Sequence, residues 1–254
     1  MTRDEILRGR LKLWQPDEGP RVTMDTVLLA AYVRPRRRAP SAFIELGAAA
    51  GAVSFMLALR FPEKFSILGI EIQEDLEALA RRNRLENGFG ENVAFRRMDL
   101  RNHRTLPPES FDGLVVNPPY EEEGRGRKSP SEADFIARQS ACCGLPDIFG
   151  AARWLLKTRG RFFAVFRAGR LAEFLALMIG GGIEPKRLRL VHPREGERAN
   201  LFLVEGLKGG GPGLTVEPPL FVYDGAGNHT PDLLKAYEPE GLPCFQPKSR
   251  RVVK

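Results

Sequence analysis

The sequence predicts an α/β fold built on one open, mostly parallel sheet with helices on both faces. Between residues 41 and 207, short apolar runs that suit buried strands alternate with longer segments of helical periodicity. Hydrophobic residues make up 43% of the 254 residues, enough to bury a large core. Several expected strands end directly at glycine, acidic or asparagine residues. Ligands bind at the carboxyl edge of the strands in such sheets, so we expect the functional site there.

The first half of the chain alternates between strand and helix patterns. Residues 8–14 suit a short strand or hairpin arm, and residues 24–33 are small and apolar, as in a buried helix capped by Thr23 or Asp25. The elements that follow are strand 42–46, helix 52–59, strand 65–70, helix 73–86, strand 93–98 and strand 114–116. Helix 73–86 is apolar on one side and charged elsewhere, so one face is expected to pack on the sheet.

The second half continues the pattern and ends in a Gly- and Pro-rich segment. Its expected elements are helices 131–141 and 146–157, strand 161–166, helix 170–179, and strands 186–191, 200–205 and 220–223. The strands at 186–191 and 200–205 are separated by a turn, which predicts an antiparallel hairpin at the sheet edge. We divide the chain into an N-terminal extension that packs on the core (1–40), a central α/β domain (41–207) and a C-terminal tail (208–254).

The most specific chemical signal is Asn117-Pro118-Pro119-Tyr120, which follows the strand at 114–116. An exocyclic amine of a nucleobase is a poor nucleophile because its lone pair is delocalised into the ring. Two acceptors aimed at its N–H groups, the side-chain oxygen of Asn117 and the carbonyl of Pro118, would free that lone pair. The prolines stiffen the turn, and Tyr120 offers a ring on which a flipped base can stack. The tetrapeptide alone also fits an ordinary proline-rich turn at a strand end.

A second signal is the turn from Glu45 to Gly51, between the strand at 42–46 and the helix at 52–59. The dinucleotide pattern Gly-x-Gly-x-x-Gly fails here twice, and the looser Gly-x-Gly-x-Gly turn of methyl donors fails once, at Ala49. Glu71 and Asp99 end the next two strands and suit a nucleoside, one carboxylate accepting from ribose hydroxyls and the other from an adenine amino group. Together with Asn117, these positions favour a ligand site over a purely structural turn.

The charge of the chain indicates a polyanionic partner. The formal net charge is +7 and the pI is about 9.6. Most basic clusters are typical of solvated surfaces, but Arg125, Arg127 and Lys128 follow the Asn-Pro-Pro-Tyr turn directly. They are therefore predicted to bind the phosphates of a nucleic acid beside the reaction centre.

Other classes of protein fit the sequence poorly. Cys142, Cys143 and Cys244 form neither a disulfide framework nor a metal-binding spacing, and the three histidines are scattered, so no metal is expected. No apolar run approaches the roughly 20 residues of a membrane span, and residues 1–5 lack a signal-peptide pattern. We expect a cytoplasmic protein whose oligomeric state stays open.

Together these residues resemble class I S-adenosylmethionine-dependent methyltransferases that act on amino nitrogens, and most closely the bacterial tRNA1(Val) adenine-N6 methyltransferase family. Besides the residues above, the resemblance rests on the segments 25–30, 129–138, 188–193, 205–210 and 218–220 and on Tyr223, so it covers nearly the whole chain. It implies a Rossmann-like, seven-stranded, mostly parallel sheet with an antiparallel edge strand.

The resemblance also implies a function and roles for individual residues. The reaction would be N6-methylation of an adenine in tRNA with S-adenosyl-L-methionine as the cofactor. Glu45, Gly47, Gly51, Glu71, Asp99 and Asn117 would bind the cofactor, with Glu71 at the ribose and Asp99 at the adenine ring. Asn117, Pro118, Pro119 and Tyr120 would handle the target base, and Asp25 would sit near the methionine end.

One departure and two alternatives accompany this interpretation. Ala49 stands where the family usually has its second glycine, which is tolerated if residue 49 keeps a negative φ. The same Asn-Pro-Pro-Tyr turn also suits a methyltransferase that modifies a glutamine amide of a protein. A non-catalytic RNA-binding module that retains the fold is the alternative that Ala49 favours.

Overall fold

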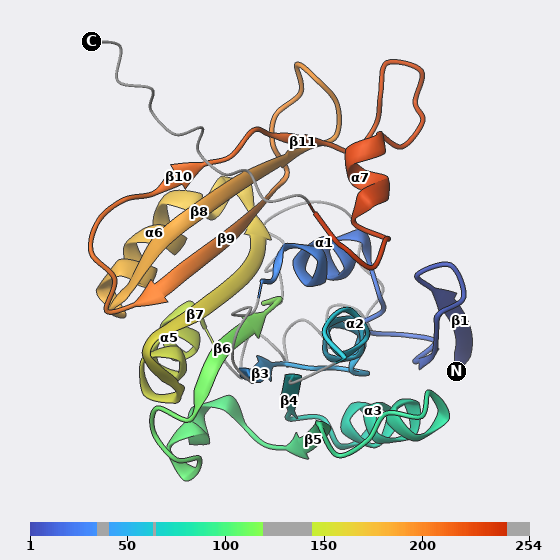
Figure 1. Ribbon diagram of the computed structural model, residues 1–254, viewed down its shortest axis with the longest axis vertical. Coiled ribbons are helices and arrows are strands. Elements are labelled where there is room, and N and C mark those ends of the chain that lie inside the picture. Colours follow the sequence, from blue (N-terminus) through green and yellow to red (C-terminus); the bar gives the residue numbers. More distant parts are fainter. Residues whose placement is uncertain (35–40, 63–64, 119–143, 243–254) are drawn as a thin grey trace.

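The computed structural model describes residues 1–34, 41–62, 65–118 and 144–242 (Figure 1). Its strands are β1 (Thr2–Ile6), β2 (Leu11–Gln15), β3 (Ser41–Leu46), β4 (Phe65–Glu71), β5 (Val93–Arg97), β6 (Phe111–Val116), β7 (Leu156–Arg167), β8 (Ile183–His192), β9 (Leu201–Lys208), β10 (Thr215–Val216) and β11 (Leu220–Phe221). Its helices are α1 (Met24–Tyr32), α2 (Ala52–Arg60), α3 (Glu74–Glu86), α5 (Leu145–Leu155), α6 (Leu171–Gly180) and α7 (Pro231–Lys235), with 3-10 turns at Leu100–Thr105 and Ala168–Arg170. The helix predicted at 131–141 lies outside the described residues.

A nine-stranded sheet forms the centre of the molecule, in the order β10–β8–β9–β7–β6–β3–β4–β5, with β11 also paired to β8. Strands β3 to β7 run parallel to one another, and β9 is antiparallel to both β7 and β8. The α/β fold class predicted from the sequence is confirmed, and so is the antiparallel pairing of the last two long strands.

Two details of the sheet differ from the expectation. The antiparallel strand β9 lies between β7 and β8, so it is not an edge strand. The C-terminal segment also adds the two-residue strand β10 along the outer edge of β8, beside β11, which forms within the strand predicted at 220–223. Strand β10 covers backbone groups that would otherwise be exposed, and it is too short to carry a recognisable sequence pattern.

The two faces of the sheet pack into two apolar clusters, because successive side chains of a strand point to opposite faces. In β7, Phe163 and Val165 belong to one cluster, whereas Phe162, Ala164 and Phe166 belong to the other. Helices α1 and α2 contribute to the first cluster and α5 and α6 to the second, so helices cover both faces (Figure 1). This burial on both sides explains why the central strands are continuous apolar runs.

Both terminal segments pack on the face that α1 covers. Leu11 and Leu13 of β2 belong to the same cluster as α1, and so do Leu220, Leu233 and Leu242 of the C-terminal segment. The Leu242 N–H also donates to the Ala31 carbonyl at 3.1 Å. The domain boundaries at 40/41 and 207/208 stay predictions.

Within the described ranges, no helix is long and apolar enough to cross a membrane. The same part of the chain holds no group of three or more His, Cys, Asp or Glu side chains arranged to hold a metal ion. Cys142, Cys143 and Cys244 lie outside it.

Candidate active site

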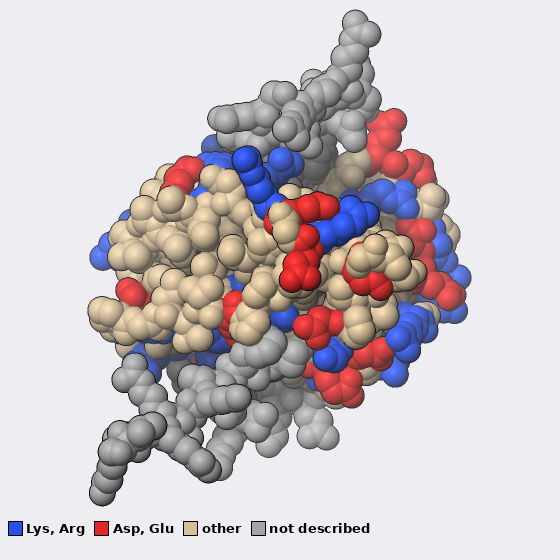
Figure 2. All heavy atoms as spheres, turned by 90° about the horizontal axis from the view of Figure 1, so that it is seen from above, with Lys and Arg blue, Asp and Glu red and all other residues tan. Residues whose placement is uncertain are grey.

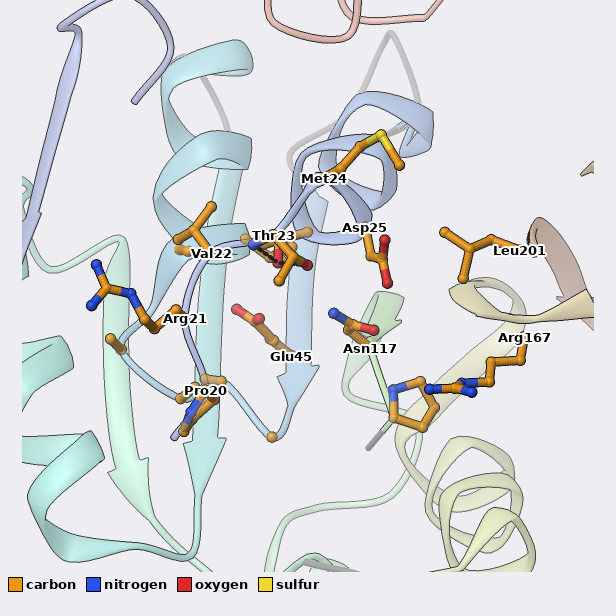
Figure 3. Close-up of a pocket in the computed structure, with 18 of the residues that line it drawn as sticks. Pro20, Arg21, Val22, Thr23, Met24, Asp25, Glu45, Asn117, Arg167 and Leu201 are labelled. Atoms are coloured by element: carbon orange, nitrogen blue, oxygen red, sulfur yellow. Dashed lines mark hydrogen bonds between the residues drawn. The ribbon is translucent and has the colours of Figure 1, made fainter. Parts of the chain in front are cut away.

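A cavity of about 1220 Å³ opens at the carboxyl edge of the parallel strands (Figure 3). Its walls come from the segment before α1 and the first turn of that helix (20–26), the loop after β3 (47–50), Asn117 and Pro118 after β6, and residues 199–201 at the start of β9. Arg167, Gly169, Arg170 and Glu173 complete the rim. The loop after β3 and the turn after β6 therefore face one common space.

The register of the sheet brings these two segments together. Leu46 at the end of β3 is paired with Val116 at the end of β6, so Gly47 and Asn117 leave the sheet next to each other. Pro118 is buried and Asn117 half-buried. Figure 3 shows the Asn117 amide in the space bordered by Asp25, Glu45 and Arg167. Of the remaining predicted site residues, Pro119, Tyr120, Arg125, Arg127 and Lys128 lie outside the described residues.

The loop after β3 turns with three residues at positive φ: Gly47 (71°), Ala49 (45°) and Gly51 (88°). The condition under which Ala49 would be tolerated, a negative φ at residue 49, is therefore not met. For a residue with a Cβ, the left-handed conformation costs about 1–2 kcal/mol. The loop accepts this cost because its backbone is held from several sides: the N–H groups of Gly47 and Ala48 donate to the Ile70 carbonyl, and Gly51 N–H donates to the Ala48 carbonyl.

The two glycines of this loop serve different purposes. A Cβ on Gly47 would meet nothing within 4 Å, so its backbone borders open space in the cavity. A Cβ on Gly51 would lie 2.6 Å from the Phe55 ring and 2.7 Å from the Phe95 ring. Close packing at the start of α2 therefore explains why residue 51 is a glycine.

Glu45 presents a buried carboxyl at the cavity wall. Its Oε2 accepts the backbone N–H of Ser54 at 3.0 Å and the Ser54 hydroxyl. Burial raises the pKa of Glu45 to about 8, and the Ser54 hydrogen bonds only partly oppose this shift. The carboxyl therefore keeps its proton at neutral pH.

This raised pKa predicts a pH-dependent stability. An unfolded Glu45 loses its proton near pH 4.5, whereas the folded one keeps it to about pH 8, so folding stability falls as the pH rises between these values. The slope from this one group is at most about 1.4 kcal/mol per pH unit. Glu45→Gln keeps an oxygen acceptor for Ser54 and removes the titration. Urea unfolding of both proteins between pH 6 and 9 is expected to show a shallower decline for the variant, and parallel curves would contradict the assignment.

Glu71 is buried at the end of β4 and holds backbone rather than bordering the cavity. Its Oε2 accepts the Ala49 N–H at 2.9 Å, and its Oε1 accepts the N–H groups of Ile72 and Gln73 at 2.9 and 3.0 Å. Burial raises its pKa, against these hydrogen bonds. Neither Glu71 nor Gly51 is among the residues that line the cavity.

Asp99 lies after β5 and caps the 3-10 turn that follows. Its carboxylate accepts the Arg101 N–H at 2.9 Å and pairs with the Arg101 guanidinium at 2.6 Å. This contact lowers the pKa of Asp99. Like Glu71, it lies outside the cavity lining, so the structure brings Glu45, Gly47, Asn117 and Pro118 together and leaves these two acidic groups beside them.

Several cavity residues were not predicted from the sequence. Arg167 is the last residue of the parallel strand β7, so the strand-end rule that pointed to Asn117 would also have found it. Asn200 precedes the antiparallel strand β9, and only the direction of that strand places it on this rim. Asp25 was expected near the site from the resemblance alone, and it lines the cavity from the first turn of α1.

Comparisons with known proteins identify the family of the chain. Residues 21–175 match the family described as "Methyltransferase small domain". The chain is 27% identical over 187 residues to a tRNA1(Val) (adenine(37)-N6)-methyltransferase of Shewanella frigidimarina. The aligned region covers 72% of this chain and 72% of that protein. It is 25% identical over 216 residues to the protein of the same name from Tolumonas auensis, with 84% of this chain and 86% of that protein covered.

Solved structures share the fold. A crystal structure described as a predicted O-methyltransferase from Agrobacterium tumefaciens superimposes with a TM-score of 0.70 at 25% identity, covering 86% of this chain and 98% of that one. A geranyl diphosphate methyltransferase in complex with S-adenosylmethionine superimposes with a TM-score of 0.53 at 12% identity, over 72% of this chain and 84% of that one. Because the family match spans more than half of its residues, the chain belongs to the methyltransferase small domain family.

Proposed function

We propose that this methyltransferase transfers a methyl group from S-adenosyl-L-methionine to the N6 amine of an adenine in tRNA. The observation that carries the proposal is the shared cavity, which is lined both by the loop after β3 and by Asn117 and Pro118. A donor bound along the loop and an amine held at the turn would meet in this one space. The names of the relatives support adenine and tRNA as the substrate.

The residues of the cavity fit the methionine end of the donor. Gly47 leaves open space where a side chain would otherwise stand, and the backbone of residues 47–50 borders the cavity. Asp25 supplies a carboxylate at the same cavity, suited to an ammonium group. Glu71 would hold the ribose of the donor and Asp99 its adenine ring, both outside the cavity lining. When bound, the donor supplies an electrophilic methyl group on a sulfonium ion.

The chain's own contribution to the chemistry is positioning and two hydrogen-bond acceptors. The side-chain oxygen of Asn117 and the carbonyl of Pro118 would accept the two N–H groups of the amine and turn its lone pair toward the methyl group. The protonated Glu45 adds no negative charge to the cavity wall near neutral pH. Pro119 and Tyr120 would stiffen the turn and stack the base, as proposed from the sequence.

Basic side chains that line the cavity support a nucleic-acid substrate. Arg21, Arg167 and Arg170 line it. On the face seen in Figure 2, Lys and Arg side chains are interspersed with Asp and Glu. The RNA contacts are therefore proposed at the cavity rim, with Arg125, Arg127 and Lys128 as further candidates.

The test is methyl transfer to a defined RNA. Purified protein, S-adenosylmethionine labelled in its methyl group and a valine tRNA transcript are expected to yield labelled N6-methyladenosine on nucleoside analysis. A matched transcript with guanosine at position 37, the position in the relatives' names, is expected to stay unlabelled. Label in both transcripts would still support a tRNA methyltransferase, but it would contradict the adenine at position 37 as the target nucleotide.

Two other outcomes separate the alternatives. Label recovered in the protein fraction of a cell extract, with none in tRNA, would favour methylation of a glutamine amide. Ala49, at φ 45°, puts a methyl group on the loop that lines the cavity, and this is the observation that favours a non-catalytic module. Absence of donor binding by calorimetry at millimolar concentration would support that module and overturn the enzyme.

A further inference from the structure

The loop after β3 is held in its unfavourable conformation by a side chain from a different element, Asn83 of α3. Asn83 is fully buried. Its Nδ2 donates to the Ala50 carbonyl at 3.1 Å and to the Trp14 carbonyl at 3.0 Å. Its Oδ1 accepts the Trp14 N–H at 2.8 Å. One amide thus joins α3, β2 and the cavity loop.

The contact falls beside the strained residue of the loop. Ala49 has a φ of 45°. Its N–H donates to the Glu71 carboxyl, and the carbonyl of the following residue, Ala50, accepts from the Asn83 amide. Alanine prefers negative φ, so the loop needs outside contacts to stay in this shape. Residues 47–50 line the cavity, and any relaxation of Ala49 would move the backbone that faces the donor.

Asn83 also bonds to the N-terminal hairpin, which consists of the antiparallel strands β1 and β2. Trp14 is fixed on α3 by its indole N–H, which donates to Glu86 at 2.6 Å, and by the Arg82 guanidinium, which lies 4.0 Å from the ring centre. A second amide one helical turn further on, Asn87, makes the same kind of bonds to β2: it donates to the Lys12 carbonyl at 2.7 Å and accepts the Lys12 N–H at 3.0 Å. No hydrogen bond from Asn87 to the loop is found among the described residues.

We propose that Asn83 is a positioning residue of the donor site, which keeps the loop after β3 in its binding conformation. This inference rests on the proposed function, because it takes the ligand of the cavity to be S-adenosylmethionine. Asn83 acts through Ala50 and touches no substrate. Its loss would therefore weaken donor binding, whereas the turnover of enzyme saturated with donor would change little.

The test is a comparison of donor affinity in four proteins. Calorimetry with S-adenosylmethionine is expected to show about a tenfold weaker Kd for Asn83→Ala, since a buried carbonyl loses its partner. Asn87→Ala removes the matching bonds to the hairpin without touching the loop, and its Kd is expected to stay at the wild-type value. Adding Ala49→Gly to Asn83→Ala removes the strain at φ 45° and is expected to recover most of the lost affinity.

The outcomes separate this inference from the proposed function. If the wild-type protein binds no donor, the proposed function fails. If the wild type binds and Asn83→Ala binds equally well, or if Asn87→Ala weakens the Kd as much, Asn83 does not position the loop. A loss that Ala49→Gly does not rescue would mean that Asn83 supports only the fold. Should Asn83→Ala not fold, as judged by circular dichroism, Asn83→Ser takes its place under the same criteria.

Discussion

Replacing Asn117 with alanine is expected to lower kcat for methyl transfer by about 10²–10³-fold while the Kd of the donor changes by less than about threefold. The reason is the position of this amide. Asn117 follows the last residue of β6, in the cavity that the loop after β3 also lines. It is proposed to hold the acceptor amine, so its removal takes away a contact made to the reacting nitrogen.

A second variant sharpens this prediction. Asn117→Asp keeps an oxygen acceptor and is expected to retain more activity than Asn117→Ala, although its charge adds to that of Asp25 on the same cavity. Single-turnover rates with labelled donor and calorimetric Kd values measure the two quantities separately. Undiminished transfer by Asn117→Ala would remove Asn117 from the mechanism, and loss of donor binding alone would assign it to the donor.

Replacing Arg187 with leucine is expected to lower the free energy of unfolding by about 3–5 kcal/mol, because it leaves the buried carboxylate of Glu217 without its ion-pair partner, whereas Glu205 keeps Arg161 at 3.3 Å. Arg187 on β8 donates to Glu217 of the C-terminal segment at 2.7 Å and to Glu205 of β9. Its guanidinium also lies 4.4 Å from the centre of the Tyr32 ring at the end of α1. The side chains of Glu217 and Glu205 are only 1% and 9% exposed.

The matched control is an exposed ion pair elsewhere on the sheet. Arg97 on β5 pairs with Glu74, and these side chains are 59% and 75% exposed. Water already screens such a pair, so Arg97→Leu is expected to change stability by less than about 1 kcal/mol. Urea unfolding measures both variants. If both variants lose a similar free energy of unfolding, the buried Arg187 contacts stabilise the protein no more than a surface ion pair does. A larger loss for Arg187→Leu would support a role of Arg187 in holding the C-terminal segment on β8 and β9.

Much of the fold and part of the site follow from local patterns. Apolar runs predict β3, β4, β6 and residues 161–166 of β7, because strands buried on both faces are largely apolar. The edge strand β5 was also predicted, although its last two residues, Arg96 and Arg97, are exposed. The carboxyl-edge rule then places Gly47 and Asn117 together, since their strands are parallel neighbours. Glu71 and Asp99 were found by the same rule, but their partners are a backbone turn and Arg101, which no pattern of strand ends predicts.

What the sequence by itself determined is the order of the described strands and helices between residues 41 and 207, the turns at Gly47 and Asn117, and the family of the chain, because each depends on residues close together along the backbone. Only the tertiary structure decided the positive φ of Ala49, the raised pKa of Glu45 and the cavity walls at 20–26 and 199–201. It also decided the contacts of Asn83 with Trp14 and of Arg187 with Glu217, which join segments 69 and 30 residues apart. Burial and hydrogen bonding of this kind arise when distant segments pack, and no local pattern encodes them.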